Sequence, residues 1–302
     1  MNESAVQKKI AKPLILLATL IWGSSFFVMK NTVDHVPVFF LLAIRFTVAA
    51  LILAVLFFRN WKGIDRDYMK SGAVMGTLLF VAYSVQTFGL ERTSSGNNAF
   101  LTAVYCVIVP FLYWGISHQR PDRYNLLAAV LCIVGIGLVS LNGSLSMNLG
   151  DLLTLASGLA YAFHIVAVAR FSQGKDVFLL TTIQFAVTAL WSWGFALLTN
   201  GFPAEVLPLD AVWRLGYLAV FATAGALLFQ NIGQKYTAPA TAAVLLSLEA
   251  PFGVLFAVLF DGERPTARML AGFVLIFVSV LCSETKFAFL RRKMVDTAAE
   301  NR

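Results

Sequence analysis

The stretch QTFGLERT at residues 86–93 returns as QNIGQKYT at residues 230–237, so that three of its residues recur 144 positions later. The match extends over residues 86–131 and 230–275. An offset of 139 relates the parts of the chain that precede these stretches, because the second half contains a longer loop. The chain therefore reads as one unit written twice.

Apolar side chains make up 59% of the 302 residues, and charged ones only 13%. This apolar fraction is too high for a soluble domain, which usually carries nearly half. A helix that crosses a bilayer needs about 20 mostly apolar residues. Such stretches occur at residues 13–32, 37–58, 71–91, 97–117, 125–142, 151–171, 177–199, 212–234, 240–260 and 267–284. The sequence thus predicts an all-α integral membrane protein with ten transmembrane helices.

The two units, residues 13–142 and 150–285, each contain five predicted spans. Since five is odd, the second unit must lie upside down relative to the first, which gives two inverted five-helix repeats. Inverted repeats are typical of secondary transporters, whose substrate site lies where the halves meet. The joint between the units is uncharged, and its Asn142-Gly143-Ser144 fits a glycosylation site but is interpreted as a plain turn.

Lysine and arginine are distributed unevenly along this topology. With the N-terminus inside, 17 of them fall on inside segments and 5 on outside segments. This positive-inside bias predicts that both termini are cytoplasmic. It also accounts for the net charge of +7 without a nucleic-acid partner. The basic tail, residues 286–302, is expected to meet anionic lipid headgroups.

The sequence offers little for catalysis or for a cofactor. Cys106, Cys132 and Cys282 fall inside predicted spans and read as small apolar packing residues, not as a disulfide or metal set. Nucleotide-binding, serine-hydrolase and zinc-protease patterns are missing from the sequence. We therefore expect no cofactor, no metal and no enzymatic activity. An intramembrane enzyme or a receptor is a remote alternative.

Two charged residues lie deep inside predicted spans, where a charge is costly and usually functional. Arg45 is about 12 Å from one surface and Glu249 about 13–14 Å from the other, at 1.5 Å per helical residue. Their repeat equivalents are the neutral Gln184 and Tyr105. The two charges could bind a zwitterion such as an amino acid, or they could form an ion pair that only joins the halves. Glu249 is also the candidate for a coupling proton.

Uncharged polar and aromatic residues accompany these charges in the spans. Trp22 is equivalent to Tyr161, and Gln86 is equivalent to Gln230. Such groups on apolar walls suit a small amphipathic solute, although each could instead make an interhelical hydrogen bond. The candidate substrate-binding residues are Trp22, Arg45, Tyr83, Gln86, Tyr105, Tyr161, His164, Gln184, Gln230 and Glu249.

Pro110 and Pro251 lie inside the fourth and ninth spans, where each is expected to free a backbone carbonyl and bend its helix. Mid-membrane breaks in both halves are typical of a binding site, and a packing kink is the alternative. Small residues cluster around Gly72, Gly135 and Gly272. They favour close helix packing within the fold over a homodimer interface.

Five strings of the chain form a recognisable set. They are Leu20-Ile21-Trp22-Gly23-Ser24-Ser25-Phe26, Ile44-Arg45-Phe46, Phe100-Leu101-Thr102-Ala103-Val104-Tyr105, Ser247-Leu248-Glu249-Ala250-Pro251 and Gly262-Glu263-Arg264-Pro265. With them the chain resembles the EamA-type branch of the drug/metabolite transporter superfamily over nearly its whole length. The resemblance implies a ten-span secondary carrier with a central cavity faced by Trp22, Arg45, Tyr105 and Glu249. The family usually has proline directly after the glutamate, whereas Ala250 intervenes here and moves the expected break by one residue.

Many carriers of this family move amino acids, other metabolites or drugs outward across the bacterial inner membrane. We therefore expect a multi-pass secondary active exporter of amino acids or similar small metabolites in that membrane, working by alternating access. Efflux of drugs or toxic compounds and metabolite uptake by the same fold are the alternatives. Since no nucleotide site is present, a gradient of protons or of the solute must supply the energy.

Overall fold

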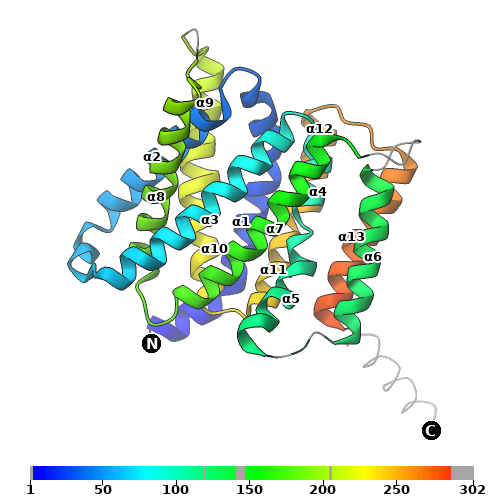
Figure 1. Ribbon diagram of the computed structural model, residues 1–302, viewed down its shortest axis with the longest axis horizontal. Coiled ribbons are helices and arrows are strands. Elements are labelled where there is room, and N and C mark those ends of the chain that lie inside the picture. The colour runs from blue at the N-terminus through cyan, green and yellow to red at the C-terminus, as the bar shows by residue number, and fades with distance from the viewer. Residues whose placement is uncertain (1–2, 119, 121, 141–146, 204–205, 287–302) are drawn as a thin grey trace.

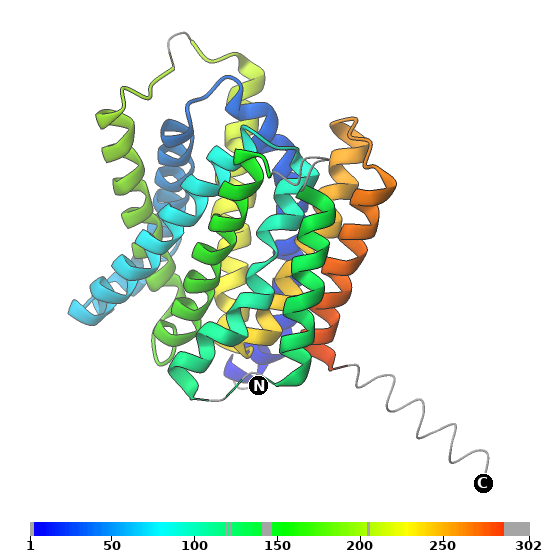
Figure 2. The same ribbon diagram turned by 45° about the vertical axis from the view of Figure 1, so that its right-hand side comes forward.

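The computed structural model describes residues 3–118, 120, 122–140, 147–203 and 206–286. These residues fold into helices joined by short loops (Figures 1 and 2). The first half contains α1 (Glu3–Val33), α2 (Val38–Leu56), a 3-10 turn (Phe58–Gly63), α3 (Arg66–Leu90), α4 (Ser95–Thr102), α5 (Tyr105–Ser117) and α6 (Arg123–Ser140). The second half contains α7 (Leu149–Phe171), α8 (Val177–Leu198), α9 (Leu209–Tyr217), a π-helical segment (Leu218–Gly225), α10 (Ala226–Lys235), α11 (Pro239–Ser247), α12 (Glu249–Phe260) and α13 (Ala267–Thr285).

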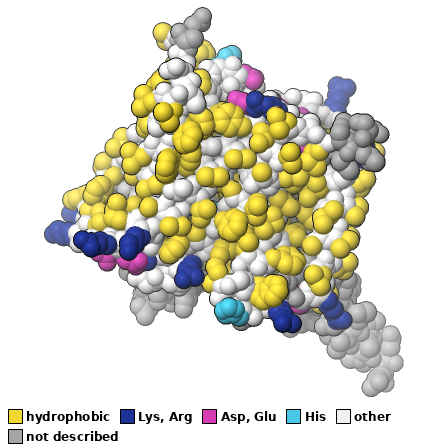
Figure 3. All heavy atoms as spheres, in the orientation of Figure 1, with side chains coloured by type: hydrophobic (Ala, Val, Ile, Leu, Met, Phe, Trp, Pro, Cys, Tyr) yellow, Lys and Arg dark blue, Asp and Glu magenta, His cyan; other side chains and the backbone are white. Residues whose placement is uncertain are grey.

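Among the described residues, eight helical segments are long and apolar enough to cross a membrane. Two shorter apolar stretches, Leu126–Val139 in α6 and Ala267–Ser279 in α13, take the places of the fifth and tenth predicted spans. The prediction of a helical, multi-pass membrane protein is thus confirmed, while the count of ten crossings stays a prediction. Figure 3 shows hydrophobic side chains across the middle of one face, with Lys and Arg gathered mostly along its lower edge. Such a belt suits contact with lipid.

Short polar side chains fix where several helices begin. Oδ1 of Asp65 accepts hydrogen bonds from the N–H groups of Asp67 and Tyr68 at the start of α3. Asp176 caps α8 in the same way, and Ser94 caps α4. These oxygens satisfy backbone donors that have no partner within the helix.

Helices of one half pack mainly against helices of the other half. α3 lies against α7, α1 against α10, α2 against α8, and α6 against α13. A Cβ added at Gly89 on α3 would lie 2.9 Å from the carbonyl oxygen of Gly150 on α7, and one at Gly233 on α10 would lie 2.7 Å from that of Ala11 on α1. The sequence offsets relate Gly89 to Gly233 and Ala11 to Gly150. The contact of α3 with α7 and the contact of α10 with α1 are therefore equivalent, with the roles of the two halves exchanged.

The small residues singled out from the sequence also pack within the chain. A Cβ at Gly135 on α6 would lie 2.9 Å from the carbonyl oxygen of Gly272 on α13, and one at Gly272 would lie 2.8 Å from that of Gly135. Gly72 on α3 faces Ile183 on α8. At these positions the close approach joins helices of one molecule.

The fourth predicted span is interrupted upstream of its proline. α4 ends at Thr102 and α5 begins at Tyr105, whereas Pro110 lies inside α5. The N–H of Val104 donates to the carbonyl of Leu101 at 3.3 Å, which is a tighter turn than an α-helix makes. A break caused by Pro110 is therefore the wrong interpretation, because the hydrogen bond it cannot donate falls one turn inside α5, which continues through it.

The ninth predicted span is interrupted where its proline predicts. α11 ends at Ser247 and α12 begins at Glu249. Pro251 lies four residues after Ser247, so it cannot donate the helical hydrogen bond to that carbonyl. Both interrupted spans thus begin a new half-helix near the middle of the bundle.

Figures 1 and 2 show the start of α1 and the end of α13 at the same end of the bundle. This arrangement agrees with an even number of crossings. The tail beyond Lys286 and the Asn142-Gly143-Ser144 turn lie outside the described residues.

Candidate functional site

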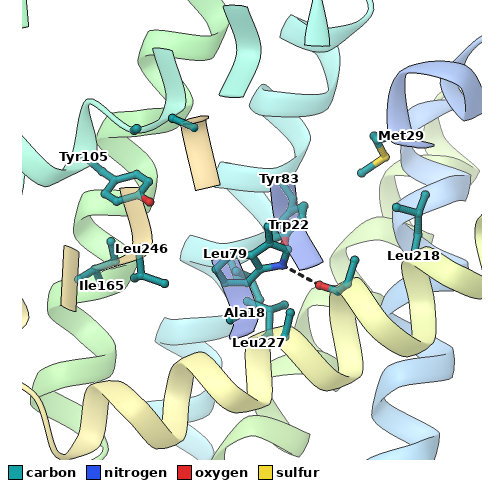
Figure 4. Close-up of a cluster of buried hydrophobic side chains, with 14 of the residues drawn as sticks. Ala18, Trp22, Met29, Leu79, Tyr83, Tyr105, Ile165, Leu218, Leu227 and Leu246 are labelled. Atoms are coloured by element: carbon teal, nitrogen blue, oxygen red, sulfur yellow. Dashed lines mark hydrogen bonds between the residues drawn. The ribbon is translucent and has the colours of Figure 1, made fainter. Parts of the chain in front are cut away.

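A cavity lies between the two halves, at the level where the half-helices α5 and α12 begin. It holds about 590 Å³ of space not filled by protein atoms, its open side included. Figure 4 shows part of its aromatic and apolar wall. The lining residues are Trp22, Ser25, Phe26, Met29, Arg45, Tyr83, Gln86, Thr87, Leu90, Asn98, Tyr105, Tyr161, Ile165, Leu227, Gln230, Leu246 and Glu249.

Arg45 on α2 is held in this wall by neutral groups. Its Nε donates to Oγ1 of Thr223 at 3.0 Å, and its Nη1 donates to Sδ of Met29 at 3.6 Å. The guanidinium carbon lies 5.0 Å from the ring centroid of Tyr83. The residue is 1% exposed, and none of the ion pairs among the described residues includes it. In the described part of the chain, its charge is therefore met by dipoles and an aromatic face.

The partner of Arg45 belongs to the π-helical segment between α9 and α10. Thr223 accepts the hydrogen bond of Arg45 from this segment, and the carbonyl of the preceding Ala222 accepts one from the indole of Trp22 at 2.8 Å (Figure 4). π-Helical turns occur mostly as short segments inside α-helices, and they are frequent at functional sites. The sequence predicted one continuous span here and did not single out Thr223.

Glu249 is the first residue of α12, and Tyr105 is the first residue of α5. The Tyr105 hydroxyl donates to Oε1 of Glu249 at 2.9 Å. Glu249 is 6% exposed, and the ion pairs found in the described part of the chain do not include it. The ion pair considered between Arg45 and Glu249 is therefore not formed. Both charges face the cavity, each with its own neutral partners.

Two equivalent glutamines complete the polar part of the wall. Nε2 of Gln86 donates to Oγ1 of Thr102 at 3.0 Å, and its Oε1 accepts from the hydroxyl of Tyr161 at 2.7 Å. Nε2 of Gln230 donates to Oε1 of Gln234, one turn further along α10, at 3.2 Å. Gln86 and Tyr161 come from different halves, so this contact also joins the halves across the cavity.

Eight of the ten residues that the sequence nominated line this cavity, and His164 and Gln184 do not. Both are fully buried in a separate polar group between α7, α8 and α10, where they lie beside each other. In that group Nδ2 of Asn231 donates to Oγ1 of Thr181 at 2.9 Å and to Oε1 of Gln184 at 3.4 Å. His164 instead packs toward α8 beside Gln184, although its equivalent Ser25 lines the cavity. The expectation that His164 and Gln184 line the substrate cavity is therefore not met by the present cavity.

Sequence reasoning missed several lining residues. Phe26, Met29 and Leu90 are apolar residues in apolar spans, so nothing local distinguishes them from lipid-facing neighbours. Thr87 did carry a signal, because it is a polar residue beside Gln86 inside a span.

The lining residues follow the sequence repeat in a regular way. Ten of the seventeen form five equivalent pairs: Trp22 with Tyr161, Phe26 with Ile165, Tyr83 with Leu227, Gln86 with Gln230, and Tyr105 with Glu249. Six more come from the first half without their equivalents: Ser25, Met29, Arg45, Thr87, Leu90 and Asn98. Among the described lining residues, only Leu246 comes from the second half in this way. The cavity is thus centred on positions that both halves share and extends toward the end of the bundle where α1 and α3 finish.

The groups in this wall are suited to binding a small polar solute. It presents one guanidinium, one carboxyl group, amides, hydroxyls and aromatic faces to an apolar pocket. In the described ranges, no three His, Cys, Asp or Glu side chains gather as metal ligands do.

Comparison with known proteins adds relatives along the whole chain. The EamA-like transporter family matches it twice, over residues 9–141 and 148–285. An uncharacterized transporter of Archaeoglobus fulgidus is 31% identical over 280 residues, which are 93% of this chain and 87% of that protein.

Further relatives are similar over comparable lengths. The uncharacterized inner membrane transporter YedA of Escherichia coli K12 is 25% identical over 283 residues, which are 91% of each chain. The uncharacterized transporter YoaV of Bacillus subtilis is 21% identical over 287 residues, which are 93% of this chain and 98% of that protein. A solved crystal structure that is 16% identical has a TM-score of 0.69 and covers 90% of this chain and 96% of its own. At that identity the likeness is one of fold alone.

Proposed function

The chain belongs to the EamA-like transporter family and is a membrane transporter rather than an enzyme, and on this premise we propose that it is a secondary active exporter of amino acids or similar small zwitterionic metabolites. We place it in the bacterial inner membrane, as the name of its relative YedA indicates for that protein. The central cavity described above is the substrate site of this proposal.

One observation carries the choice of substrate. Arg45 and Glu249 line the same cavity, and neither belongs to an ion pair among the described residues. A buried charge without a counter-charge is costly, most of all inside a membrane. A zwitterion would supply both counter-charges at once, with its carboxylate toward Arg45 and its ammonium toward Glu249. The apolar wall would then receive the substrate's side chain.

Two inverted five-helix repeats that alternate the access to this site are part of the proposal. The double family match supports two equivalent halves. The contacts of Gly89 with Gly150 and of Gly233 with Ala11 support them too, because equivalent residues meet equivalent residues. Half-helices that begin in mid-bundle are the feature from which such carriers build their midplane sites.

Glu249 also gives the proposal a route to energy coupling. Its carboxyl group can hold either the ammonium of the substrate or a proton, but not both at the same place. Competition of this kind makes the two ions travel in opposite directions, since the carrier returns with whichever one displaced the other. A proton gradient directed inward would therefore drive the amino acid outward.

The test is efflux from proteoliposomes loaded with single radiolabelled amino acids, each compared with its methyl ester and its N-acetyl derivative. We expect saturable efflux of at least one amino acid and about tenfold weaker transport of both derivatives, because a hydrogen bond to a charged group contributes about 1.5–3 kcal/mol. An ester that leaves as fast as its parent amino acid would contradict the charge matching. A complete panel without saturable efflux would contradict amino acids as the cargo.

A further inference from the structure

We propose that His164, Gln184, Asn231 and Gln234 line a second form of the cavity, which opens at the opposite, predicted cytoplasmic, end of the bundle. The inference rests on the proposed alternating access. It names the residues that a solute meets on the cytoplasmic side, and it explains the two nominated residues that the present cavity leaves out.

The four residues are the repeat equivalents of lining residues that come from the first half alone. The equivalences are Ser25 with His164, Arg45 with Gln184, Thr87 with Asn231, and Leu90 with Gln234. When the two halves of an inverted repeat exchange conformations, the cavity moves to the other side of the membrane. The positions shared by both halves stay in the cavity, and the unpaired positions are replaced by their equivalents.

These four side chains are buried and poorly satisfied in the present form. Each is at most 2% exposed. Among the described residues, Oδ1 of Asn231 and Nε2 of Gln234 have no hydrogen-bond partner. Both ring nitrogens of His164 and Nε2 of Gln184 make no hydrogen bond of normal length and angle, although the imidazole and the amide lie beside each other. These atoms are five of the ten buried side-chain nitrogen and oxygen atoms that make no such bond among the described residues. Unpaired polar groups are costly in a membrane interior, so this concentration at four equivalent positions points to a form in which they meet water or solute.

A second cavity already reaches Gln234, one of these four residues, from the other end. It holds about 950 Å³, its open side included. It is lined by the last two residues of α10, by the loop that follows up to Pro239, and by residues of α5 and of the end of α7 and the turn after it. Oε1 of Gln234 accepts the hydrogen bond of Gln230, which lines the central cavity. The two glutamines are four residues apart, about 6 Å along the helix axis. One turn of α10 thus separates the two cavities.

The second form would hold the same zwitterion by different chemistry. Gln184 takes the place of Arg45, and His164 takes the place of Ser25. Amide and imidazole groups would then face the solute where a guanidinium faces it in the present form. A neutral amide binds a carboxylate less strongly than a guanidinium does. We therefore expect a higher half-saturation concentration for substrate added from the cytoplasmic side.

The test is cysteine labelling of two equivalent positions, Thr87→Cys and Asn231→Cys. The background variant carries alanine in place of the native cysteines Cys106, Cys132 and Cys282. A membrane-impermeant thiol reagent is added to right-side-out and to inside-out vesicles. Thr87→Cys should react from the outside, and Asn231→Cys should react only from the cytoplasmic side.

The control is Ser192→Cys on α8, a fully buried position outside both cavities. Asn231→Cys should react at least about tenfold faster than this control, since minor states are commonly populated at about 0.1–10%. Labelling of Asn231→Cys at the control rate, or from the outside, would overturn the inference.

Two further variants keep the test informative if Asn231→Cys does not fold. Val168→Cys and His164→Cys replace buried residues that are equivalent to Met29 and Ser25 of the present cavity. Both should also react only from the cytoplasmic side, and inert thiols at both would overturn the inference. Labelling needs no substrate, so a protein that transports no amino acid but shows this pattern would contradict the proposed cargo and support the second form.

Discussion

Tyr105 and Glu249 stand 144 positions apart in the sequence, yet the tyrosine hydroxyl lies 2.9 Å from the carboxylate oxygen that accepts its hydrogen bond. They are the equivalent first residues of two half-helices, α5 and α12. Two equivalent residues can touch only where the halves meet. The carboxyl group of the cavity is therefore fixed at its centre, by a donor from the other half.

Replacing Tyr105 with phenylalanine removes this donor while keeping the ring. We expect the KM of amino-acid efflux from proteoliposomes to rise about tenfold at a nearly normal protein level, because a hydrogen bond to a charged group is worth about 1.5–3 kcal/mol. Tyr124→Phe on α6, outside both cavities, is the matched control and should leave the KM unchanged. An unchanged KM in Tyr105→Phe would show that the hydroxyl does not orient the carboxylate for substrate.

Depth in the bundle explains which site residues could be predicted from the sequence. A polar residue in an apolar span is a strong signal, and it identified Arg45, Gln86, Gln230 and Glu249. The signal does not state which end of the bundle a cavity faces. Gln184 carries it as clearly as Arg45, its equivalent, but only Arg45 lies on the side toward which the present cavity extends.

Backbone irregularity and the direction in which the cavity extends set the other limit. Tyr161 and Ile165 line the cavity while His164 between them does not, although Ser25, which has the same spacing between Trp22 and Phe26, does line it. The π-helical segment that presents Thr223 to Arg45 has no proline, and only Gly225 marks its end. Its position depends on packing between helices, which a single span does not encode.

Arg45→Gln tests the carboxylate end of the site. The wild-type protein should prefer an amino acid to its methyl ester, and the variant should lose most of this preference while transporting both slowly. The reason is that the ester differs from its parent by the charge that Arg45 would bind. Uptake and efflux of the two compounds by the same proteoliposome preparation give the ratio directly.

The control for this variant is Arg66→Gln, which removes an exposed arginine at the start of α3. It should keep the wild-type ratio. If Arg45→Gln is instead absent from the membrane at normal expression, Arg45 mainly joins the two halves and is not the group that binds the substrate carboxylate.

Glu249→Gln tests the coupling. Wild-type efflux should accelerate when the outside is made more acidic than the inside, and a protonophore should remove the acceleration. A glutamine cannot carry a proton, so the variant should show no response to the gradient. Efflux from Glu249→Gln that still follows the proton gradient would show that a residue other than Glu249 carries the coupled proton.

Gly89→Ala and Gly233→Ala test the equivalence of the two halves. The new methyl groups would lie within 3.0 Å of the carbonyl oxygens of Gly150 and Ala11, respectively, which belong to helix backbones that cannot yield cheaply. Each substitution should destabilise the protein by about 1–3 kcal/mol, the usual range for overpacking. Thermal unfolding in detergent, followed by loss of the monodisperse peak, gives the two Tm values.

Gly194→Ala on α8 is the control, since nothing lies within 4 Å of a Cβ at that position. There alanine removes the entropic disadvantage of glycine in a helix, which is about 0.5–1 kcal/mol, so the Tm should stay the same or rise. The two interface variants should fall by similar amounts, because each opens the same helix contact on its own side of the bundle. A large loss of Tm at Gly89 with none at Gly233 would mean that the contact of α3 with α7 is not equivalent to the contact of α10 with α1. The inverted repeat would then lose its strongest structural support.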